Sequence, residues 1–182
     1  MLPLLTETLC IRPFHMSDAP AFAEAVFESL PNLGIWMPWC HEDYAIEDAQ
    51  AWFVTCADSL QAETAYDFGI FSVDGQVLYG GISINVINRE HNFANVGYWV
   101  RRSQQRRGVA SSAVRRIAAY GFGDLGLTRL EILAEPDNLA SCRVAEKSGA
   151  KFEGIARNRL MVNDALRNAA VYGLIPEDFL GD

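Results

Sequence analysis

The chain has 182 residues, half of them hydrophobic, and a formal net charge of −8. This length suits one packed domain, so residues 1–182 are expected to form a single domain. No apolar run approaches the ~20 residues that a membrane helix needs, and no basic residue precedes the apolar start, as it would in a secretion signal. The acidic balance also argues against general nucleic-acid binding. We expect a cytoplasmic protein with neither a membrane nor a nucleic acid as partner.

Cysteine and histidine residues are scattered along the chain: Cys10, Cys40, Cys56 and Cys142, and His15, His41 and His91. No two cysteines have the C-x-x-C spacing of a zinc site or a redox centre. The simplest interpretation is four reduced thiols, mostly buried. The sequence therefore predicts no metal site.

The first part of the chain predicts a strand followed by two helices. A short strand is expected over residues 9–13, and Ser17 is a plausible N-cap for the first helix. Apolar residues recur at helical spacing on one face of that helix: Ala19, Phe22, Ala23, Val26, Phe27 and Leu30. A second helix is predicted from about 47 to 60. Between the helices, residues 36–41 form an aromatic segment broken by a proline.

In the rest of the chain, strands and helices alternate. The predicted strands are, in chain order, 68–73, 77–86, 93–100, 129–134, 157–162 and 169–175. Hairpin turns are predicted at Asp74-Gly75 and Asn163-Asp164. One helix is expected to start near Gly108, and another covers 139–147 and ends at Gly149. This order predicts an α/β fold in which helices pack on a mixed sheet.

Positive charge gathers in one segment of this acidic chain. Six arginines and no acid lie between Arg101 and Arg116. The segment leads from a strand through Gly108 into a helix, whose first backbone N–H groups have no partner within the helix. With the helix dipole, such a junction suits a pyrophosphate, and a glycine lets the backbone approach it closely. A solvated helix face is the alternative, since runs of charge usually are solvated.

The same junction carries a motif. Gln105-Arg106-Arg107-Gly108-Val109-Ala110 resembles the Q/R-x-x-G-x-G/A signature of the GNAT acetyltransferase superfamily. The resemblance implies that these six residues bind the pyrophosphate of acetyl-coenzyme A. It also implies that the preceding strand, with Trp99 and Val100, lies along the pantetheine and the acetyl group. A backbone N–H of that strand is then the natural donor to the thioester oxygen.

A second match follows at the distance that the family leads us to expect. Residues 131–141 resemble a segment in which a strand ends in N-x-x-S at the start of a helix, here Asn138 and Ser141. The resemblance implies that Asn138 binds the pantetheine or holds the strands apart. It implies that Ser141 lies near the thiol and protonates the leaving thiolate. Helix capping is the alternative role for both residues.

Five features resemble the Rim-type subgroup, which acetylates the N-terminal amine of ribosomal proteins: residues 9–13, 36–39 and 97–100, Asn138-x-x-Ser141, and Val171-Tyr172. Together they span nearly the whole chain. The resemblance implies the GNAT fold, an α/β fold whose mixed, mostly antiparallel central sheet is flanked by helices on both faces. It further implies acetyl-coenzyme A as cosubstrate, no metal, a protein N-terminus as the acceptor and, as in many relatives, a homodimer.

One position departs from the subgroup and leaves the general base open. Where Rim-type sequences often have a glutamate before an N-G turn, this chain has Leu160. That glutamate is a candidate base in relatives. Here the candidates are Glu131, acting directly or through a water, and His41 or Glu42. An ion pair at the sheet edge is the alternative role for Glu131.

The acceptor is open as well. Trp36, Trp39 and His41 are expected to line the acceptor side, with core packing as the alternative for the two tryptophans. A small-molecule amine, such as a polyamine or an aminoglycoside, is the second acceptor class. A non-catalytic module that binds acyl-coenzyme A is a third hypothesis, favoured only by the missing glutamate.

Overall fold

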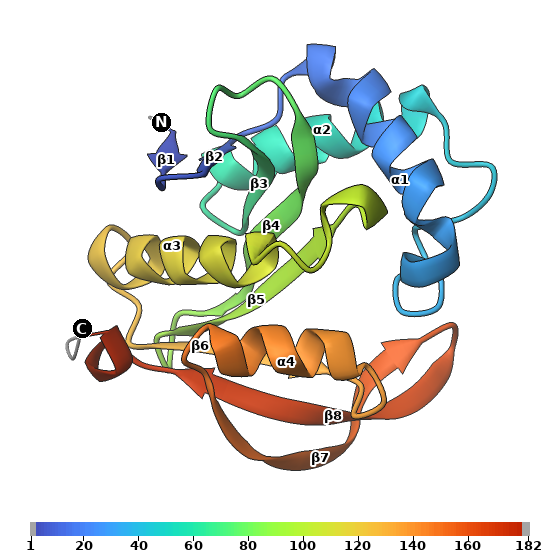
Figure 1. Cartoon of the computed structure of the whole chain (residues 1–182). Coiled ribbons are helices and arrows are strands. Elements are labelled where there is room, and N and C mark those ends of the chain that lie inside the picture. The colour runs from blue at the N-terminus through green and yellow to red at the C-terminus, as the bar shows by residue number, and fades with distance from the viewer. Residues whose placement is uncertain (1–2, 180–182) are drawn as a thin grey trace.

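The computed structural model describes residues 3–179 (Figure 1). Its strands are β1 (Leu4–Leu5), β2 (Leu9–Arg12), β3 (Tyr66–Ser72), β4 (Leu78–Asn88), β5 (Phe93–Val100), β6 (Arg129–Ala134), β7 (Lys151–Val162) and β8 (Ala165–Leu174). Its α-helices are α1 (Ala19–Leu33), α2 (Ile46–Gln61), α3 (Val109–Gly123) and α4 (Leu139–Lys147). The strands form one sheet in the order β1-β2-β3-β4-β5-β6-β8-β7. Neighbouring strands are antiparallel except β5 and β6.

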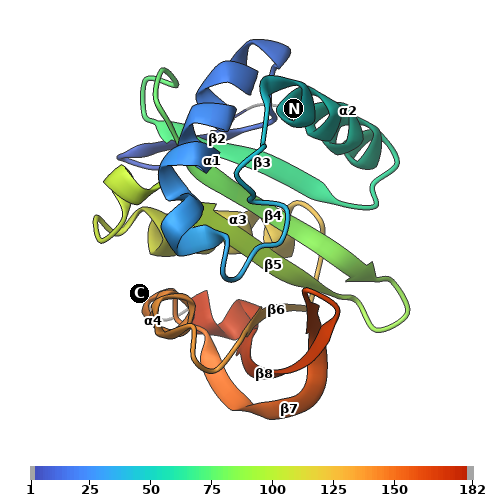
Figure 2. The same cartoon turned by 90° about the vertical axis from the view of Figure 1, so that its right-hand side faces the viewer.

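Helices cover both faces of the sheet (Figures 1 and 2). On one face α1 and α2 pack against β3 and β4, and Phe22, Phe53 and Trp99 belong to one buried cluster there. On the other face α3 and α4 cover a larger cluster that includes Ile84 and Ile117. The predicted mixed α/β architecture, with helices on both faces, is confirmed. Within residues 3–179, no helix has both the length and the apolar character to cross a membrane.

The parallel pair β5 and β6 diverges. The two strands pair only where Phe93–Asn95 lies beside Arg129–Glu131. Beyond these residues their carboxyl ends move apart (Figure 1). Backbone N–H and C=O groups on this edge of β5 therefore face the gap instead of a neighbouring strand.

The C-terminal hairpin is longer than the sequence predicted. β7 begins at Lys151 rather than 157, and β8 begins at Ala165 rather than 169. Much of the added length is exposed, so it lacks the buried face that makes alternation visible in a sequence. The predicted turn is confirmed: Asn163 and Asp164 both have positive φ, at 49° and 58°.

The N-cap predicted for the first helix was wrong. Ser17 lies within a 3₁₀ turn, Met16–Asp18, and Asp18 is the N-cap of α1. The Asp18 carboxylate accepts hydrogen bonds from the Arg12 guanidinium (2.7 Å) and from the His15 backbone N–H (2.8 Å). An ion pair with β2 therefore fixes where α1 begins, and a local cap signal cannot reveal that contact.

Candidate active site

Two adjoining cavities open beside the point where β5 and β6 separate. The first, of about 270 Å³, lies between these strands and is called the cleft. The second, of about 390 Å³, lies under α1 and α2 and is called the aromatic pocket. Met37, Gly97 and Tyr98 line both, so the two cavities meet over the backbone of β5.

The cleft has a polar and an apolar side. Its polar side lies at the end of β6 and the start of α4 and includes Glu135, Asn138 and Ser141. Its apolar side includes Leu160 of β7, and Trp36 also lines it. Leu160 occupies the position where the Rim-type subgroup often has a glutamate. In this chain a hydrocarbon side chain faces the cleft there, so that position provides no base.

The loop before α3 has the shape of an anion site. Arg106 and Gly108 both have positive φ, at 62° and 78°. Gly108 is the N-cap of α3, and a Cβ built on it would meet nothing within 4 Å. Successive N–H groups in such a turn, followed by the first turn of a helix at Val109 and Ala110, form a concave anion site. The Gln105 side chain braces the loop by donating to the Val100 carbonyl (2.9 Å).

The six arginines of this segment divide into two groups. Three bind protein atoms: Arg101 contacts Glu24 and Glu28, Arg115 the Lys147 carbonyl, and Arg116 the Leu5 carbonyl. The side chains of Arg102, Arg106 and Arg107 are exposed and have no such partner among the described residues. Only half of the predicted cluster is therefore available to an anion.

Arg101 joins the loop to α1, and Arg101→Met is expected to lower the free energy of unfolding. The Arg101 Nε donates to Glu28 (2.8 Å), and methionine would remove this partner. We expect a loss of about 2 kcal/mol, between the values for exposed and for buried pairs. Burial alone would raise the pKa of Glu28, but hydrogen bonds from Arg101 and Ser103 outweigh it and hold the pKa below 4.5.

The stabilisation by this pair is therefore complete above about pH 4.5 and is lost as the pH falls further. Urea unfolding at neutral and at acid pH tests this: the difference between wild type and Arg101→Met should shrink in acid. Arg102→Met is the matched control, since its guanidinium is exposed. An equal loss in both variants would contradict the prediction.

Asn138 caps α4, Ser141 lies in the first turn of that helix, and both line the cleft. The Asn138 Oδ1 accepts a hydrogen bond from the Ser141 backbone N–H (3.1 Å). The Tyr98 hydroxyl lies 3.1 Å from the Ser141 hydroxyl and donates to the Ser141 carbonyl (3.0 Å). Burial raises the pKa of Tyr98 to about 12, although the hydrogen bond with Ser141 acts the other way. Tyr98 thus keeps its proton at neutral pH and orients Ser141.

The predicted bases lie away from both cavities. The Glu131 carboxylate accepts hydrogen bonds from Arg129 (3.1 Å), which also binds Glu153 (2.7 Å). Glu131 lines neither cavity, and its contacts match the alternative role of an ion pair, although it lies on an internal strand rather than at the sheet edge. His41 is exposed, with its ring 5.8 Å from that of Tyr44, and also lines neither cavity. A role for Glu131 as base stays a prediction that this geometry does not favour.

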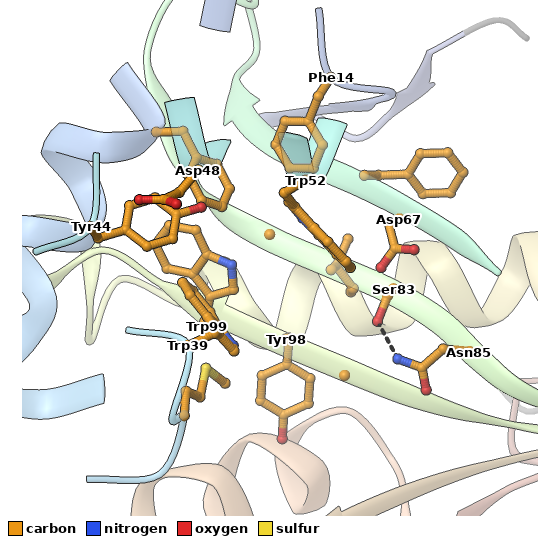
Figure 3. A pocket seen from close by; sticks show the side chains of 16 residues that line it. Phe14, Trp39, Tyr44, Asp48, Trp52, Asp67, Ser83, Asn85, Tyr98 and Trp99 are labelled. Atoms are coloured by element: carbon orange, nitrogen blue, oxygen red, sulfur yellow. Dashed lines mark hydrogen bonds between the residues drawn. The ribbon is translucent and has the colours of Figure 1, made fainter. Parts of the chain in front are cut away.

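Eight aromatic side chains line the aromatic pocket: Phe14, Phe22, Trp39, Tyr44, Trp52, Phe68, Tyr98 and Trp99. Trp39, Tyr44, Trp52 and Trp99 are among those labelled in Figure 3. Its floor depends on glycine. A Cβ on Gly81 would stand 2.6 Å from the Trp99 indole nitrogen, and a Cβ on Gly97 would stand 3.1 Å from the Ser83 hydroxyl. Trp39, predicted on the acceptor side, lies in this pocket, whereas Trp36 lies in the cleft.

One end of the aromatic pocket is polar. Asp67 of β3 and Ser83 and Asn85 of β4 line it (Figure 3). Asn85 donates to the Ser83 hydroxyl (2.8 Å) and accepts from Asn95 (2.9 Å). Burial raises the pKa of Asp67 to about 6. Sequence reasoning missed these residues: the predicted strand began at 68, whereas β3 begins at Tyr66 and so includes Asp67, its single charged residue.

Residues suited to a metal do not converge. Within residues 3–179, no group of three or more His, Cys, Asp or Glu side chains could hold a metal ion. The four cysteines are free thiols, and all are buried.

Comparison with known proteins identifies the family. The family model described as acetyltransferase (GNAT) domain matches residues 8–151. The chain is 30% identical over 177 residues to the uncharacterized N-acetyltransferase YoaA of Bacillus subtilis, covering 96% of this chain and 98% of that protein. It is 32% identical over 108 residues to the ribosomal-protein-serine acetyltransferase of Escherichia coli, covering 59% of each.

A solved structure has the same fold. Mycobacterium smegmatis RimJ in complex with CoA-disulfide superposes with a TM-score of 0.85 at 23% identity, covering 100% of this chain and 93% of that chain. The diverging strands, the left-handed loop before α3 and the matched family model agree: the chain belongs to the GNAT acetyltransferase family and is an acetyltransferase.

Proposed function

We propose that this protein transfers the acetyl group of acetyl-coenzyme A to a primary amine, with the α-amine of a protein N-terminus as the favoured acceptor. The observation that carries the proposal is that the cleft and the aromatic pocket meet at Gly97 and Tyr98. Two substrates can therefore approach each other over β5. The similarity to the Escherichia coli ribosomal-protein-serine acetyltransferase favours a protein acceptor, and the buried free thiols suit a cytoplasmic setting.

Acetyl-coenzyme A fits the residues around the cleft. Its pyrophosphate would lie on the backbone N–H groups at Gly108 to Ala110, with the exposed Arg106 and Arg107 nearby. The open space above Gly108 leaves room for it. The Asn138 amide nitrogen remains available to the pantetheine because the amide oxygen caps α4. The Trp99 ring faces the aromatic pocket, so this residue contributes its backbone on the coenzyme side.

The protein groups provide what acyl transfer needs. Acetyl-coenzyme A supplies the thioester carbon that the amine attacks. Backbone N–H groups on β5 beyond Asn95 face the gap and stabilise the oxygen as it gains negative charge. The Ser141 hydroxyl, oriented by Tyr98, gives its proton to the departing thiolate. Direct attack by the amine needs no covalent enzyme intermediate.

A small-molecule amine is the second candidate acceptor. The aromatic pocket has a volume of about 390 Å³, a size typical of sites for small ligands. A non-catalytic acyl-coenzyme A module is the third candidate, and the presence of Leu160 in the cleft favours it.

Thiol release from acetyl-coenzyme A distinguishes these candidates. The acceptors are one peptide with a free α-amine, the same peptide with an acetylated α-amine, a polyamine and an aminoglycoside. We expect thiol release and a mass gain of one acetyl group only on the peptide with the free amine. Asn138→Ala, which loses the pantetheine contact and the α4 cap, should turn over more slowly.

The other outcomes are equally informative. Turnover of a small amine alone would assign the second acceptor class. Tight coenzyme binding in calorimetry without turnover of any acceptor would favour the binding module and contradict an enzyme. A protein that fails to bind acetyl-coenzyme A would contradict the whole proposal.

A further inference from the structure

Asp67 is a partly buried carboxylate in a cavity that offers it no cation. It enters the polar end of the aromatic pocket (Figure 3), whose lining residues include no Arg, Lys or His. Within residues 3–179, no hydrogen bond or ion pair is made by its side chain. Burying an unpaired charge is costly. A carboxylate kept in this state is therefore available to a cation that arrives with a ligand.

The strand register leads from Asp67 to the point where the cavities meet. Asp67 lies opposite Ser83, and Ser83 lies opposite Gly97. Residues directly opposite each other on antiparallel strands point to the same face, with Cβ atoms about 5 Å apart. Ser83 therefore stands between the Asp67 carboxylate and Gly97, which lines both cavities.

The hydrogen bonds around Ser83 leave its hydroxyl proton and one of its lone pairs free. The Asn85 Nδ2 donates to this hydroxyl (2.8 Å), so one of its lone pairs is occupied. The Asn85 Oδ1 accepts from Asn95 (2.9 Å), which fixes the direction of the amide. A hydroxyl has one proton and two lone pairs. Ser83 therefore keeps its proton and one lone pair free: it can accept an N–H from a ligand and, because no direct hydrogen bond joins it to Asp67, donate towards that carboxylate through a bridging water.

The other carboxylates that line the cavities are less suited to bind an incoming ammonium group and take its proton. Glu135 lies 3.9 Å from Arg167, which stabilises its charge. Asp48 is exposed and accepts the Ala45 backbone N–H (2.8 Å) at the start of α2. The position before the β7–β8 turn is occupied by Leu160.

We infer that Asp67 and Ser83 form a proton relay that draws the acceptor ammonium into the aromatic pocket and removes its proton. This inference rests on the proposed amine acetylation and assigns its missing base. The first proton passes from the ammonium nitrogen through the Ser83 hydroxyl and a bridging water to the Asp67 carboxylate, and then to solvent. The freed lone pair forms the C–N bond as the C–S bond breaks. Ser141 gives its proton to the departing sulfur, and the second nitrogen proton returns to Ser141, so the products are the amide, the free thiol and one proton in solvent.

The relay implies a pH dependence. Burial raises the pKa of Asp67 to about 6, so most of the carboxylate is charged at pH 7, whereas below pH 6 most of it is already protonated and cannot act as a base. The titratable groups that face it are the Cys56 thiol of α2, whose own pKa is raised by burial and by the Asp67 charge, and Tyr44, Asp48 and Tyr98 around the pocket. Activity should therefore fall on the acid side, with a midpoint near pH 6.

Asp67→Asn tests the relay. We expect kcat/KM for the acceptor to fall about 100-fold at pH 7, the range of general base catalysis, and the acid limb near pH 6 to disappear. In Ser83→Ala, kcat/KM for the acceptor should fall less, by about tenfold, because a water can replace the missing hydroxyl. Asp58→Asn, an exposed carboxylate of α2 away from both cavities, is the matched control and should keep wild-type kinetics.

A stability readout separates the relay from a structural role. Because the fold raises the pKa of Asp67, it disfavours the charged form above pH 6. Asp67→Asn should therefore keep or raise the melting temperature at pH 8, and coenzyme binding should be unchanged. If Asp67 were needed for the fold instead, its replacement would lower the melting temperature and weaken coenzyme binding.

The results also separate this inference from the proposed function. Wild-type kcat/KM and an intact acid limb in Asp67→Asn would overturn the relay alone, provided that the wild type acetylates an amine. Lost coenzyme binding or a lower melting temperature in Asp67→Asn would overturn it as well. If the wild type acetylates no amine, the proposed function fails and the relay fails with it.

Discussion

Replacing Ser141 with alanine is expected to lower kcat about 100-fold, the lower end of what a positioned proton donor contributes. The Ser141 hydroxyl lines the cleft and is held by Tyr98 at 3.1 Å. The thiolate would then leave without a proton. The KM for acetyl-coenzyme A should change by less than about threefold, because the lost interaction acts in the transition state. Steady-state kinetics with a saturating acceptor provide the measurement.

Two further variants sharpen this test. Tyr98→Phe keeps the Ser141 hydroxyl but removes the group that orients it, so a smaller loss of about tenfold is expected. Ser59→Ala, on the distant part of α2, is the matched serine control and should behave as wild type. If Ser141→Ala kept the wild-type kcat, the proton donor would have to be another group. Tyr98, with its pKa raised to about 12 by burial, would then be the next candidate.

Gly80→Ala is expected to have the largest effect on stability. Gly80 lies on β4 beside the bulge that β4 makes against β3, opposite Val100. A Cβ there would overlap the main-chain oxygen of Trp99, and the φ of 158° adds backbone strain. Because the clash is with backbone, β4 and β5 would have to separate. We expect the free energy of unfolding to fall by about 3 kcal/mol, the upper range for overpacking, and the melting temperature to fall by about 10 °C.

Thermal and urea unfolding measure this loss, and Gly123→Ala is the matched control. Gly123 is the last residue of α3, and a Cβ there would meet nothing within 4 Å. Alanine favours the helix, so this variant should be neutral or slightly more stable. If Gly80→Ala unfolded like the wild type, the close approach between β4 and Trp99 would be contradicted.

The sequence predicted site residues best where the residues of a motif are close together in the chain. The run from Gln105 to Ala110 predicted an anion site, and the structure places Gly108 in a left-handed conformation at the start of α3. The N-x-x-S pattern likewise placed Asn138 and Ser141 at a helix start. Both motifs depend on consecutive residues, whose mutual geometry is set by the backbone of a single turn.

Residues far apart in the sequence were harder to assign. Glu131 was a reasonable candidate base by position, but the structure surrounds it with Arg129 and places it outside both cavities. Three of the six clustered arginines likewise bind helix and strand atoms. The chain alone does not show which charges are already paired, because the partners come from other elements.

The sequence by itself determined the fold family, the order of strands and helices, and the two motifs beside the cleft, because these depend on local periodicity and on consecutive residues. Only the tertiary structure showed which side chains line the pocket proposed for the acceptor. Asp67, Ser83 and Gly97 lie on three strands and meet because the antiparallel register puts them opposite one another. Register depends on pairing between distant segments. The base proposed for a chain with Leu160 in the cleft could therefore be found only from the folded structure.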